Sequence, residues 1–490
     1  MAFRVDVTES RGLSDYEAVA HLAPAVGELR TVADAAARSL SGRTVWMVNS
    51  TAQGGGVAEM LPTAVTLMRE LGVSTEWVVI ESENAEFFEL TKTLHNLIHG
   101  QGDPSLDRSS REVFEEENRQ NAEFLLERMQ PGDVLIVHDP QPMPLAGMVK
   151  EQVNVHAVWR CHIGLDEANA ASRAAWKFLE PYGRAYDHAV FSTPEYVTDF
   201  LADRATVIHP WIDPLVEKNE ELHVHRLVGI LSNAALISST GPMVPHPDSN
   251  IAMRLHADGS FRPATMWEDI GLLSRPIVTE VSRWDQLKGF RPLLDAFVGL
   301  KRRLYDSTDL DGSWEQRRRL DLVRLVLAGP DPASIQDDPE GVEILEDLSA
   351  AYLELDPTIQ AEVALVALPM SSSRHNALIV NALQRCSTVI VQNSLREGFG
   401  LTITEAMWKG IPILTNSRAC GPRHQVRDGI DGRLIRDPED TQELGEALQE
   451  MLSDPTGRRA WGRNAQRRAH DKFLVFGQLQ SWLRLLSSLV

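Results

Sequence analysis

Cysteine is scarce in this 490-residue chain, which contains only three such residues, Cys161, Cys386 and Cys420, at widely separated positions. Three scattered thiols predict neither a disulfide framework nor a zinc site, and they fit a reducing compartment. Apolar runs long enough to cross a bilayer are missing, and charged residues stand near the start, where a signal peptide needs an apolar segment. The sequence therefore predicts a soluble, cytoplasmic protein with no membrane partner.

Positive charge is also in short supply, with 48 Lys and Arg residues against 69 Asp and Glu residues and a formal net charge of -21. Such an acidic chain is not expected to bind nucleic acid or an anionic membrane. Its most basic run, residues 457–469, is interpreted as a solvated helix face. An anionic substrate must therefore meet a local cluster of cations.

Apolar, β-branched runs alternate with helical stretches along most of the chain, which is typical of doubly wound parallel sheets. The runs lie at residues 44–48, 76–80, 133–138, 156–159, 188–192 and 205–209, and then at residues 276–281, 322–328, 364–368, 388–392 and 411–415. We therefore predict an α/β protein with two Rossmann-like domains.

The two series of strands set the expected domain boundaries. Residues 1–215 form the first domain with an N-terminal helical extension, and residues 276–470 form the second. Residues 216–275, rich in Ser, Pro, Gly and His, are interpreted as a linker with an insertion, and residues 471–490 as a helix that packs back on the first domain.

Residues 394–410 combine a strand exit, a glycine loop and a helix start. Gly398 and Gly400 let the backbone approach a ligand, and the N-terminus of the following helix attracts anions, above all phosphate. Thr402 and Glu405 have the spacing of a capping box at that helix start. Glu397 is either a loop charge or a ligand-binding carboxylate. Glu405 is either the capping-box residue of this helix or a second ligand-binding carboxylate, so that one glutamate could face a sugar and the other a nucleotide.

Other candidate residues also follow predicted strands. Arg283 and Lys288 come after the run at 276–281, as either two solvated cations or a clamp on a diphosphate. Residues 54–56, Gly54-Gly55-Gly56, are either a tight turn or a ligand loop that only loosely matches a dinucleotide fingerprint.

Three more candidates stand at the ends of strands in the first series. Arg160 and His162 follow the run at 156–159, although a lone His is more often structural than catalytic. Asp139 follows the run at 133–138, where it could instead form an Asx turn before Pro140.

Several segments together resemble the retaining glycosyltransferases of family 4, which have the GT-B architecture of two Rossmann-like domains facing a central cleft. The resemblance is closest to their trehalose synthase branch. The segments that carry it are residues 49–60, 137–142, 159–163, 194–196 and 212–215 in the first half, and residues 281–285, 288–289 and 396–410 in the second.

The resemblance implies roles for the candidate residues. In the second domain, Arg283 and Lys288 would hold the donor diphosphate, Glu405 the ribose, and Glu397, with the backbone of Gly398, Phe399, Gly400 and Leu401, the hexose and phosphate. In the first domain, His162 would face the transferred glucose, Gly54, Gly55 and Gly56 would close over the substrates, and Asp139, Arg160 and Asp166 would bind the acceptor. Gly164 stands where the branch has Asp, a place that Asp166 could fill.

The implied activity is transfer of glucose from ADP- or UDP-glucose to free glucose, giving trehalose with retention of configuration. The acceptor would attack from the leaving-group face and pass its proton to the diphosphate, so no protein base is required. We expect no tightly bound cofactor and no metal ligand set among the site residues, leave a role of Mg²⁺ open, and regard a homodimer as possible.

Four alternatives remain at this point. The chain could transfer glucose to another acceptor, or it could be a trehalose phosphorylase that uses glucose 1-phosphate. It could also be an NAD-dependent oxidoreductase, with Gly54 to Gly56 as the nucleotide loop and Glu81 after the next strand, although the fingerprint is incomplete. Finally, it could bind sugar nucleotides as a sensor without turnover.

Overall fold

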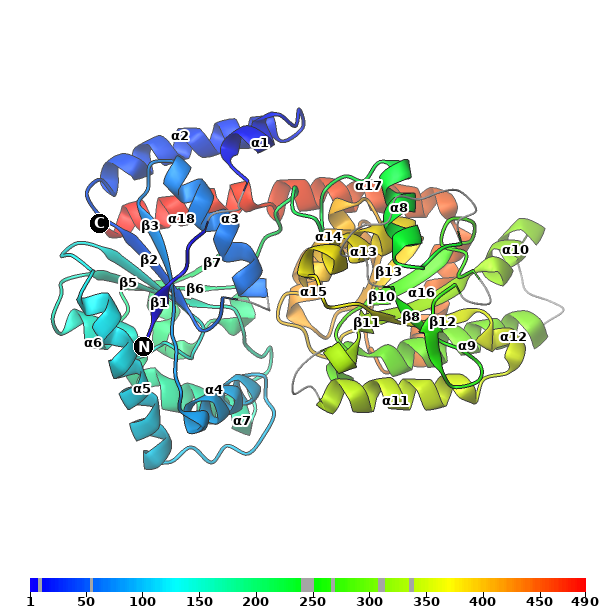
Figure 1. Cartoon of the computed structure of the whole chain (residues 1–490), viewed down its shortest axis with the longest axis horizontal. Helices are drawn as coiled ribbons and strands as arrows, with labels where there is room; N and C mark the ends of the chain where they lie inside the picture. The colour runs from blue at the N-terminus through cyan, green and yellow to red at the C-terminus, as the bar shows by residue number, and fades with distance from the viewer. Residues whose placement is uncertain (8–10, 53–55, 239–250, 266–268, 307–312, 335–338) are drawn as a thin grey trace. The chain divides into compact units, whose positions relative to one another are not determined.

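The computed structural model describes residues 1–7, 11–52, 56–238, 251–265, 269–306, 313–334 and 339–490. The chain divides into two compact units (Figure 1). Unit 1 comprises Met1–Asp213 together with Lys472–Val490, and unit 2 comprises Pro214–Asp471.

Unit 1 is built on a seven-stranded sheet with the order β1-β3-β2-β4-β5-β6-β7. Its strands are β1 (Phe3–Arg4), β2 (Val45–Asn49), β3 (Thr75–Val79), β4 (Val134–His138), β5 (His156–Cys161), β6 (His188–Phe191) and β7 (Ala205–Val207). Neighbouring strands pair in parallel, except that β1 pairs antiparallel with β3 at the edge. β2 and β4 are buried along their whole length, which explains their continuous apolar sequences.

Helices cover both faces of this sheet. They are α1 (Leu13–Glu17), α2 (Ala23–Ser39), α3 (Gly56–Glu70), α4 (Ala85–Ile98), α5 (Arg108–Leu126), α6 (Leu145–Lys150), α7 (Ala170–Gly183) and α18 (Val475–Leu489), with short 3₁₀ turns at Pro194–Tyr196 and Asp199–Arg204. Figure 1 shows α2, α3 and α18 on one face and α4, α5 and α7 on the other, and α18 packs against α2 and α3.

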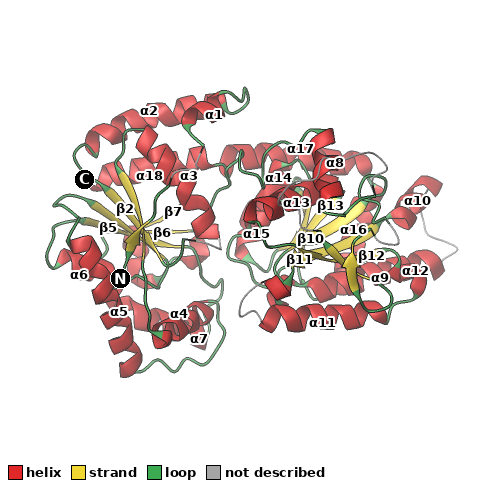
Figure 2. Ribbon diagram, in the orientation of Figure 1, coloured by secondary structure: helices red, strands yellow, loops and turns green. Residues whose placement is uncertain are grey.

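Unit 2 is built on an eight-stranded sheet with the order β15-β14-β13-β10-β11-β12-β8-β9. Its strands are β8 (Met253–Leu255), β9 (Phe261–Pro263), β10 (Ile277–Val281), β11 (Arg324–Pro330), β12 (Val363–Leu368), β13 (Val389–Gln392), β14 (Ile413–Asn416) and β15 (Gly432–Ile435). The strands from β10 to β15 pair in parallel, whereas the β8–β9 hairpin joins the edge of β12 antiparallel. Figure 2 shows the strands of this sheet, in yellow, among the helices, in red.

Both faces of the second sheet are also buried under helices. These are α8 (Val224–Asn233), α9 (Phe290–Asp306), α10 (Trp314–Leu322), α11 (Pro339–Leu353), α12 (Pro357–Gln360), α13 (Ser373–Cys386), α14 (Leu401–Trp408), α15 (Cys420–Gln425), α16 (Thr441–Ser453) and α17 (Pro455–Lys472), with 3₁₀ turns at Gln286–Lys288 and Pro332–Ser334. Along β11, Leu325 and Leu327 pack into one core cluster and Val326 and Ala328 into the other. Burying a large aliphatic side chain contributes roughly 1.5–3 kcal/mol, so each strand stabilises both layers.

The strand predictions were largely confirmed, since each expected run overlaps an observed strand of a doubly wound α/β sheet. The sequence did not predict β1, β8, β9 or β15. Residues 216–275, interpreted as a linker and insertion, contain α8 and the β8–β9 hairpin, and they belong to unit 2.

The order of strands indicates where each sheet can bind a ligand. In unit 2, β10 lies between β11 and β13, so the chain reverses direction across the sheet at this point. In unit 1 the corresponding strand is β2, between β3 and β4. Open α/β sheets bind ligands at the carboxyl ends of the strands at such a switch point. None of the helices in the described residues is long and apolar enough to span a membrane.

Candidate active site

The loops that follow β10 and β13 are in direct backbone contact at the switch point of unit 2. Leu395 N donates a hydrogen bond of 2.7 Å to the carbonyl of Leu287. Gly289 has a φ of +70°, and a Cβ at this position would lie 2.2 Å from the carbonyl oxygen of Asn393. Only glycine fits this approach, so residue 289 fixes the distance between the two loops.

Lys288 and Glu397 meet across these loops. Nζ of Lys288 donates to Oε2 of Glu397 over 2.6 Å, and the Ser394 hydroxyl donates to the same oxygen over 3.0 Å. Gln392 in turn donates to the Ser394 hydroxyl over 2.8 Å. The side chains of Lys288 and Glu397 keep 16% and 15% of their surface exposed, so the pair is held in place and still reachable.

Arg283 lies in the same loop as Lys288 but not in the same cluster. Its side chain is 74% exposed, and its nearest carboxylate partner is Asp285, at 3.5 Å. The structure therefore brings Lys288 and Glu397 together and leaves the Arg283 guanidinium at the surface.

The glycine loop at 398–400 ends where α14 begins. Gly400, at a φ of +85°, is the N-cap residue of α14, and no side chain caps the helix. The predicted capping box of Thr402 and Glu405 is therefore wrong, because the helix starts at Leu401 and Glu405 falls in its interior. The side-chain amide of Gln425 donates to the carbonyls of Phe399 and Gly400, which holds the loop from behind.

Glu405 is buried on α14 within a group of polar side chains. Its Oε1 lies 3.8 Å from Nζ of Lys218, and its Oε2 accepts a bond of 3.5 Å from Gln384. Burial lowers the pKa of Lys409 to about 7, and the charge of Glu405 opposes this shift. Glu405 thus sits between two lysines rather than at a helix end.

Glu280, on β10, is a buried carboxyl group close to the Lys288–Glu397 pair. Neither of its oxygens makes a well-formed hydrogen bond with the described residues. Burial raises its pKa well above the ordinary value, and the charge of Lys288 and the backbone of Asn393 act weakly in the opposite direction. Glu280 is therefore a buried carboxyl group with a raised pKa next to the Lys288–Glu397 pair.

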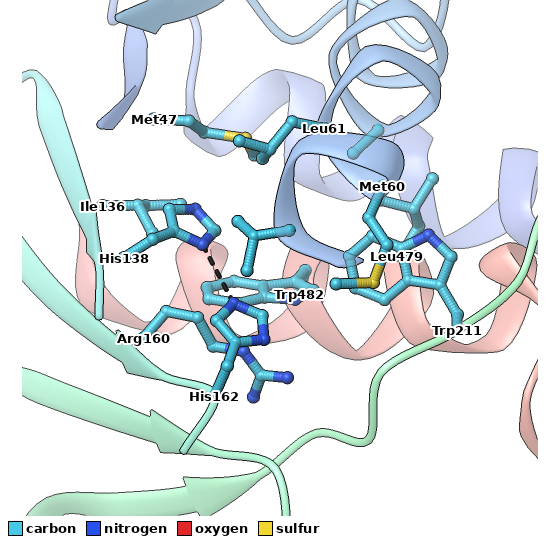
Figure 3. Close-up of a pocket in the computed structure, with 12 residues that line it drawn as sticks. Met47, Met60, Leu61, Ile136, His138, Arg160, His162, Trp211, Leu479 and Trp482 are labelled. Carbon is cyan, nitrogen blue, oxygen red and sulfur yellow. Dashed lines mark hydrogen bonds between the residues drawn. The ribbon is translucent and has the colours of Figure 1, made fainter. Parts of the chain in front are cut away.

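In unit 1, the ends of β4 and β5 bring two histidines and an arginine together (Figure 3). His138 lies opposite Arg160 in the parallel register, and His162 follows two residues later. Nδ1 of His138 and Nε2 of His162 are 3.2 Å apart, and the ring centroids are 5.5 Å apart with an interplanar angle of 12°. These three side chains line a small pocket with apolar residues that include Met47, Met60, Leu61, Ile136, Trp211 and Trp482.

The charge state of this cluster follows from burial. Arg160 is 1% exposed, and its Nε and Nη1 have no hydrogen-bond partner among the described residues. Burial lowers its pKa to about 10, which still leaves it charged at neutral pH. Burial and the Arg160 charge lower the pKa of His138 to about 3 and that of His162 well below its usual value, so both imidazoles are neutral.

Asp139 orients the turn that carries His162. It has a positive φ of 62°, its N–H donates to the Arg160 carbonyl over 2.7 Å, and its Oδ1 accepts the His162 N–H over 2.8 Å. Burial raises the pKa of Asp139 to about 6, and the His162 bond and the Arg160 charge oppose this shift. The Asp139 carboxylate thus bonds to His162, directly after β5, and not within an Asx turn before Pro140, the alternative considered for this position.

The remaining candidates of unit 1 lie nearby in sequence. Gly164 packs against the ring of Tyr196, and a Cβ at residue 164 would lie 2.3 Å from Cγ of Tyr196. Asp166 is partly exposed in the loop before α7. Gly56 is the first residue of α3, while Gly54 and Gly55 lie outside the described residues.

Three residues of these clusters were not among the candidates from the sequence. His138 could have been found, because it ends the strand next to the one that carries Arg160. Glu280 also had a signal, as a charge inside the otherwise apolar run at 276–281. Lys218 had none, because it lies in a segment interpreted as a linker.

The described residues offer neither a metal site nor a disulfide bond. Within the described ranges, no group of three or more His, Cys, Asp and Glu side chains could hold a metal ion. Cys161, Cys386 and Cys420 are free thiols, and burial raises the pKa of Cys161 and Cys386.

Two family models match the chain. The model of the trehalose synthase N-terminal domain matches residues 47–198, and the model of glycosyl transferases group 1 matches residues 369–468. The first match includes His138 and His162, and the second includes Glu397 and Glu405.

Curated relatives match over nearly the whole chain. Trehalose synthase of Pyrococcus horikoshii is 33% identical over 455 residues, which cover 92% of each chain. Trehalose synthase of Thermococcus litoralis is 32% identical over 483 residues, which cover 98% of each chain. Trehalose phosphorylase of Pleurotus pulmonarius is 25% identical over 89% of this chain and 56% of its own length.

Solved structures share the fold at low sequence identity. The E. coli trehalose-6-phosphate protein bound with UDP-2-fluoro glucose has a TM-score of 0.62 at 15% identity, covering 91% of this chain and 99% of that one. An Anabaena protein in complex with UDP and glucose has a TM-score of 0.57 at 15% identity, covering 91% and 100%. Together, the two sheets, the two family models and the full-length relatives show that this chain belongs to the trehalose synthase family of GT-B glycosyltransferases.

Proposed function

We propose that this enzyme transfers glucose from a nucleotide sugar, ADP- or UDP-glucose, to free glucose and forms trehalose with retention of configuration, as a member of glycosyltransferase family 4. The observation that carries the proposal is the Lys288–Glu397 pair, at the switch point of the unit 2 sheet of a trehalose synthase family member. Donor binding at this point agrees with the general rule for open α/β sheets.

The donor diphosphate needs cations, and the loop after β10 supplies two. Lys288 is partly buried and Arg283 is exposed, so Arg283 is free to swing toward a phosphate without breaking a strong contact. Charge neutralisation by both would stabilise the diphosphate as it leaves. Glu397 would then exchange its bond with Lys288 for bonds to sugar hydroxyl groups, while Gly398, Phe399, Gly400 and Leu401 would offer backbone N–H groups.

Glu405 would bind the ribose hydroxyl groups from its buried place near Lys218 and Lys409. In unit 1, His162 would face the transferred glucose, with Arg160 and Asp139 holding the strand ends that present it. Asp166 is proposed for the acceptor, since Gly164 has no room for a side chain against Tyr196. Gly54 to Gly56 would close over the substrates.

The proposed chemistry needs no protein base. The acceptor hydroxyl would attack the anomeric carbon from the leaving-group face and give its proton to a departing diphosphate oxygen. Support comes from the polar groups of unit 1, where the two histidines and Arg160 are arranged as buried, neutral or cationic groups and not as a nucleophile with its base.

A matrix of donors and acceptors tests this function. The purified chain is incubated with ADP-, UDP- and GDP-glucose and with glucose, glucose 6-phosphate or other hexoses, and nucleoside diphosphate release and products are measured. Release with glucose and formation of a non-reducing disaccharide is the expected result. Arms with EDTA and with added Mg²⁺ decide metal dependence, and size-exclusion chromatography shows whether the chain forms a homodimer.

A trehalose phosphorylase is the second candidate, favoured by the 25% identity to the Pleurotus enzyme over 89% of this chain. It would cleave trehalose with inorganic phosphate and give glucose 1-phosphate without any nucleotide. Incubating the chain with trehalose and either phosphate or a nucleoside diphosphate separates the two reactions. We also propose a cytoplasmic location, which the free thiols support.

A further inference from the structure

The contact between His138 and His162 limits where their protons can be. Nδ1 of His138 and Nε2 of His162 face each other at 3.2 Å, and Figure 3 shows Nδ1 of His162 directed away from His138. A hydrogen bond between two ring nitrogens needs one protonated and one unprotonated nitrogen. Because both imidazoles are neutral, each carries a single N–H.

Two arrangements of protons satisfy this contact. In the first, His138 carries its proton on Nδ1 and donates to Nε2 of His162, so His162 carries its own proton on Nδ1. In the second, His162 donates from Nε2, which leaves its Nδ1 unprotonated and forces the proton of His138 onto Nε2.

The surroundings of His138 distinguish the two arrangements. Its Nε2 is buried without a hydrogen-bond partner among the described residues, beside apolar side chains such as Met47 and Ile136. In the second arrangement this atom would be a buried N–H with no acceptor. Orphaned buried donors are rare in folded proteins, and under-satisfied acceptors are tolerated somewhat better. The first arrangement is therefore the more stable one.

We propose that His138 is a positioning residue that fixes the tautomer of His162, so that His162 presents an N–H donor from Nδ1 to the substrate. The part of the proposal that concerns the substrate rests on the proposed function, in which His162 faces the transferred glucose. A donor at this position recognises an oxygen lone pair of a sugar hydroxyl group. An unprotonated Nδ1 would instead require the hydroxyl group to donate.

Asp139 and Arg160 support the hydrogen bond between His138 and His162 without being part of it. Asp139 holds the backbone of His162 through its 2.8 Å bond to the N–H, which keeps the residue next to His138. The buried Arg160 charge disfavours a second proton on either ring. The pair therefore stays a neutral donor and acceptor.

Nitrogen NMR of the ring tests the proposal directly. In ¹⁵N-histidine-labelled enzyme without substrate, the signals of His162 are assigned by comparison with His162→Gln, and their shifts tell a protonated from an unprotonated ring nitrogen. The expected result is a protonated Nδ1 and an unprotonated Nε2. A proton on Nε2 of His162 in the wild-type enzyme overturns the proposal, and this readout does not depend on any transferase activity.

Two substitutions at residue 138 separate positioning from packing. In His138→Asn the amide can keep a donor near the place of Nδ1, whereas His138→Phe keeps a ring and has no donor. We expect His138→Phe to lose the preference of His162 for Nδ1–H and to lower kcat/KM about tenfold, the size of one lost hydrogen bond. We expect His138→Asn to restore the tautomer and most of the activity.

The possible outcomes test the positioning role of His138 and the proposed transferase function separately. If His138→Phe keeps both the Nδ1–H tautomer and wild-type kcat/KM, the positioning role is wrong. If His138→Phe does not fold, the wild-type spectrum and His138→Asn still decide. If no donor and acceptor pair gives transfer, the proposed function fails, while the spectrum alone still tests whether His138 sets the tautomer.

Discussion

Nζ of Lys288 lies 2.6 Å from Oε2 of Glu397, although the two residues are 109 positions apart in the chain. Each follows a parallel strand of the same sheet, β10 for Lys288 and β13 for Glu397, and these strands are direct neighbours. The fold thus produces a paired cation and carboxylate at the switch point before any substrate binds. Such preorganisation lowers the cost of ordering a site around a donor.

Replacing either member of this pair should abolish most of the glucosyl transfer. We expect Lys288→Ala and Glu397→Ala each to lower kcat by about 10²–10³-fold, the usual effect of removing one preorganised electrostatic contact. Arg291→Ala is the matched control, because it breaks an exposed helical ion pair with Asp295 a few residues away. Initial rates with saturating donor measure the effect, and near wild-type rates in both site variants would remove the pair from the site.

The double variant of Lys288 and Glu397 should cost less than the sum of the two single effects. Side chains in direct contact act as one unit, so their free-energy contributions are not additive. Full additivity in the double-mutant cycle would mean that the two residues act on separate steps.

Glu280 should make stability depend on pH in a direction opposite to that of ordinary carboxylates. In the unfolded chain, the Glu280 carboxyl group has its ordinary pKa of 4.5 and loses its proton above that pH. In the folded state the raised pKa keeps the proton bound to higher pH. Unfolding is then favoured as pH rises, by about 1.4 kcal/mol per pH unit until the folded pKa is reached.

The substitution Glu280→Gln removes this contribution while keeping the shape of the side chain. We expect its advantage in unfolding free energy over the wild type to grow as the pH rises above the ordinary value of 4.5 in urea titrations. A difference that does not change with pH would show that Glu280 is ionised in the fold.

Gly164 should be sensitive to even the smallest side chain. Its Cβ would lie 2.3 Å from Cγ of Tyr196, so Gly164→Ala must displace a buried ring. We expect a loss of roughly 1–3 kcal/mol in unfolding free energy, as for overpacking of a core. Gly27→Ala is the control, because no atom lies within 4 Å of the added Cβ in α2, and it should stabilise the protein slightly. A neutral Gly164→Ala would contradict the observed packing.

Glu405 should contribute to binding of the donor nucleotide and not to binding of the acceptor. We expect Glu405→Gln to weaken nucleoside diphosphate binding about tenfold, because the amide keeps only one oxygen that can accept a hydroxyl hydrogen bond. Glu446→Gln, at an exposed position of α16, is the comparison. Calorimetric titration with ADP and UDP measures the change, and an unchanged dissociation constant would place the ribose elsewhere.

The sequence predicted the sheets well because their signal is local. Buried parallel strands such as β4 and β12 are short apolar runs, the pattern expected of strands covered on both faces. The edge elements lack this signal, since β1 and the strands of the β8–β9 hairpin are two or three residues long and both residues of β1 are exposed.

The candidate site was predicted in its residue types but not in its contacts. The sequence identified Lys288, Glu397, Arg160 and His162, yet it could not show that Lys288 pairs with Glu397 or that His138 pairs with His162. The capping interpretation of Glu405 was wrong because Gly400, in a left-handed conformation, is the N-cap residue, two positions before Thr402. The Lys288–Glu397 and His138–His162 contacts depend on which strands are neighbours in a sheet. The spacing of residues along the chain does not give that order.

The most direct test of the proposed activity is an NMR spectrum of the product. The enzyme is incubated with ADP- or UDP-glucose and glucose labelled with ¹³C at its anomeric carbon. The expected product is α,α-trehalose in which one anomeric carbon carries the label and no reducing end remains. Labelled glucose that stays free while nucleotide is unused, or a labelled product that keeps a reducing end, would contradict it.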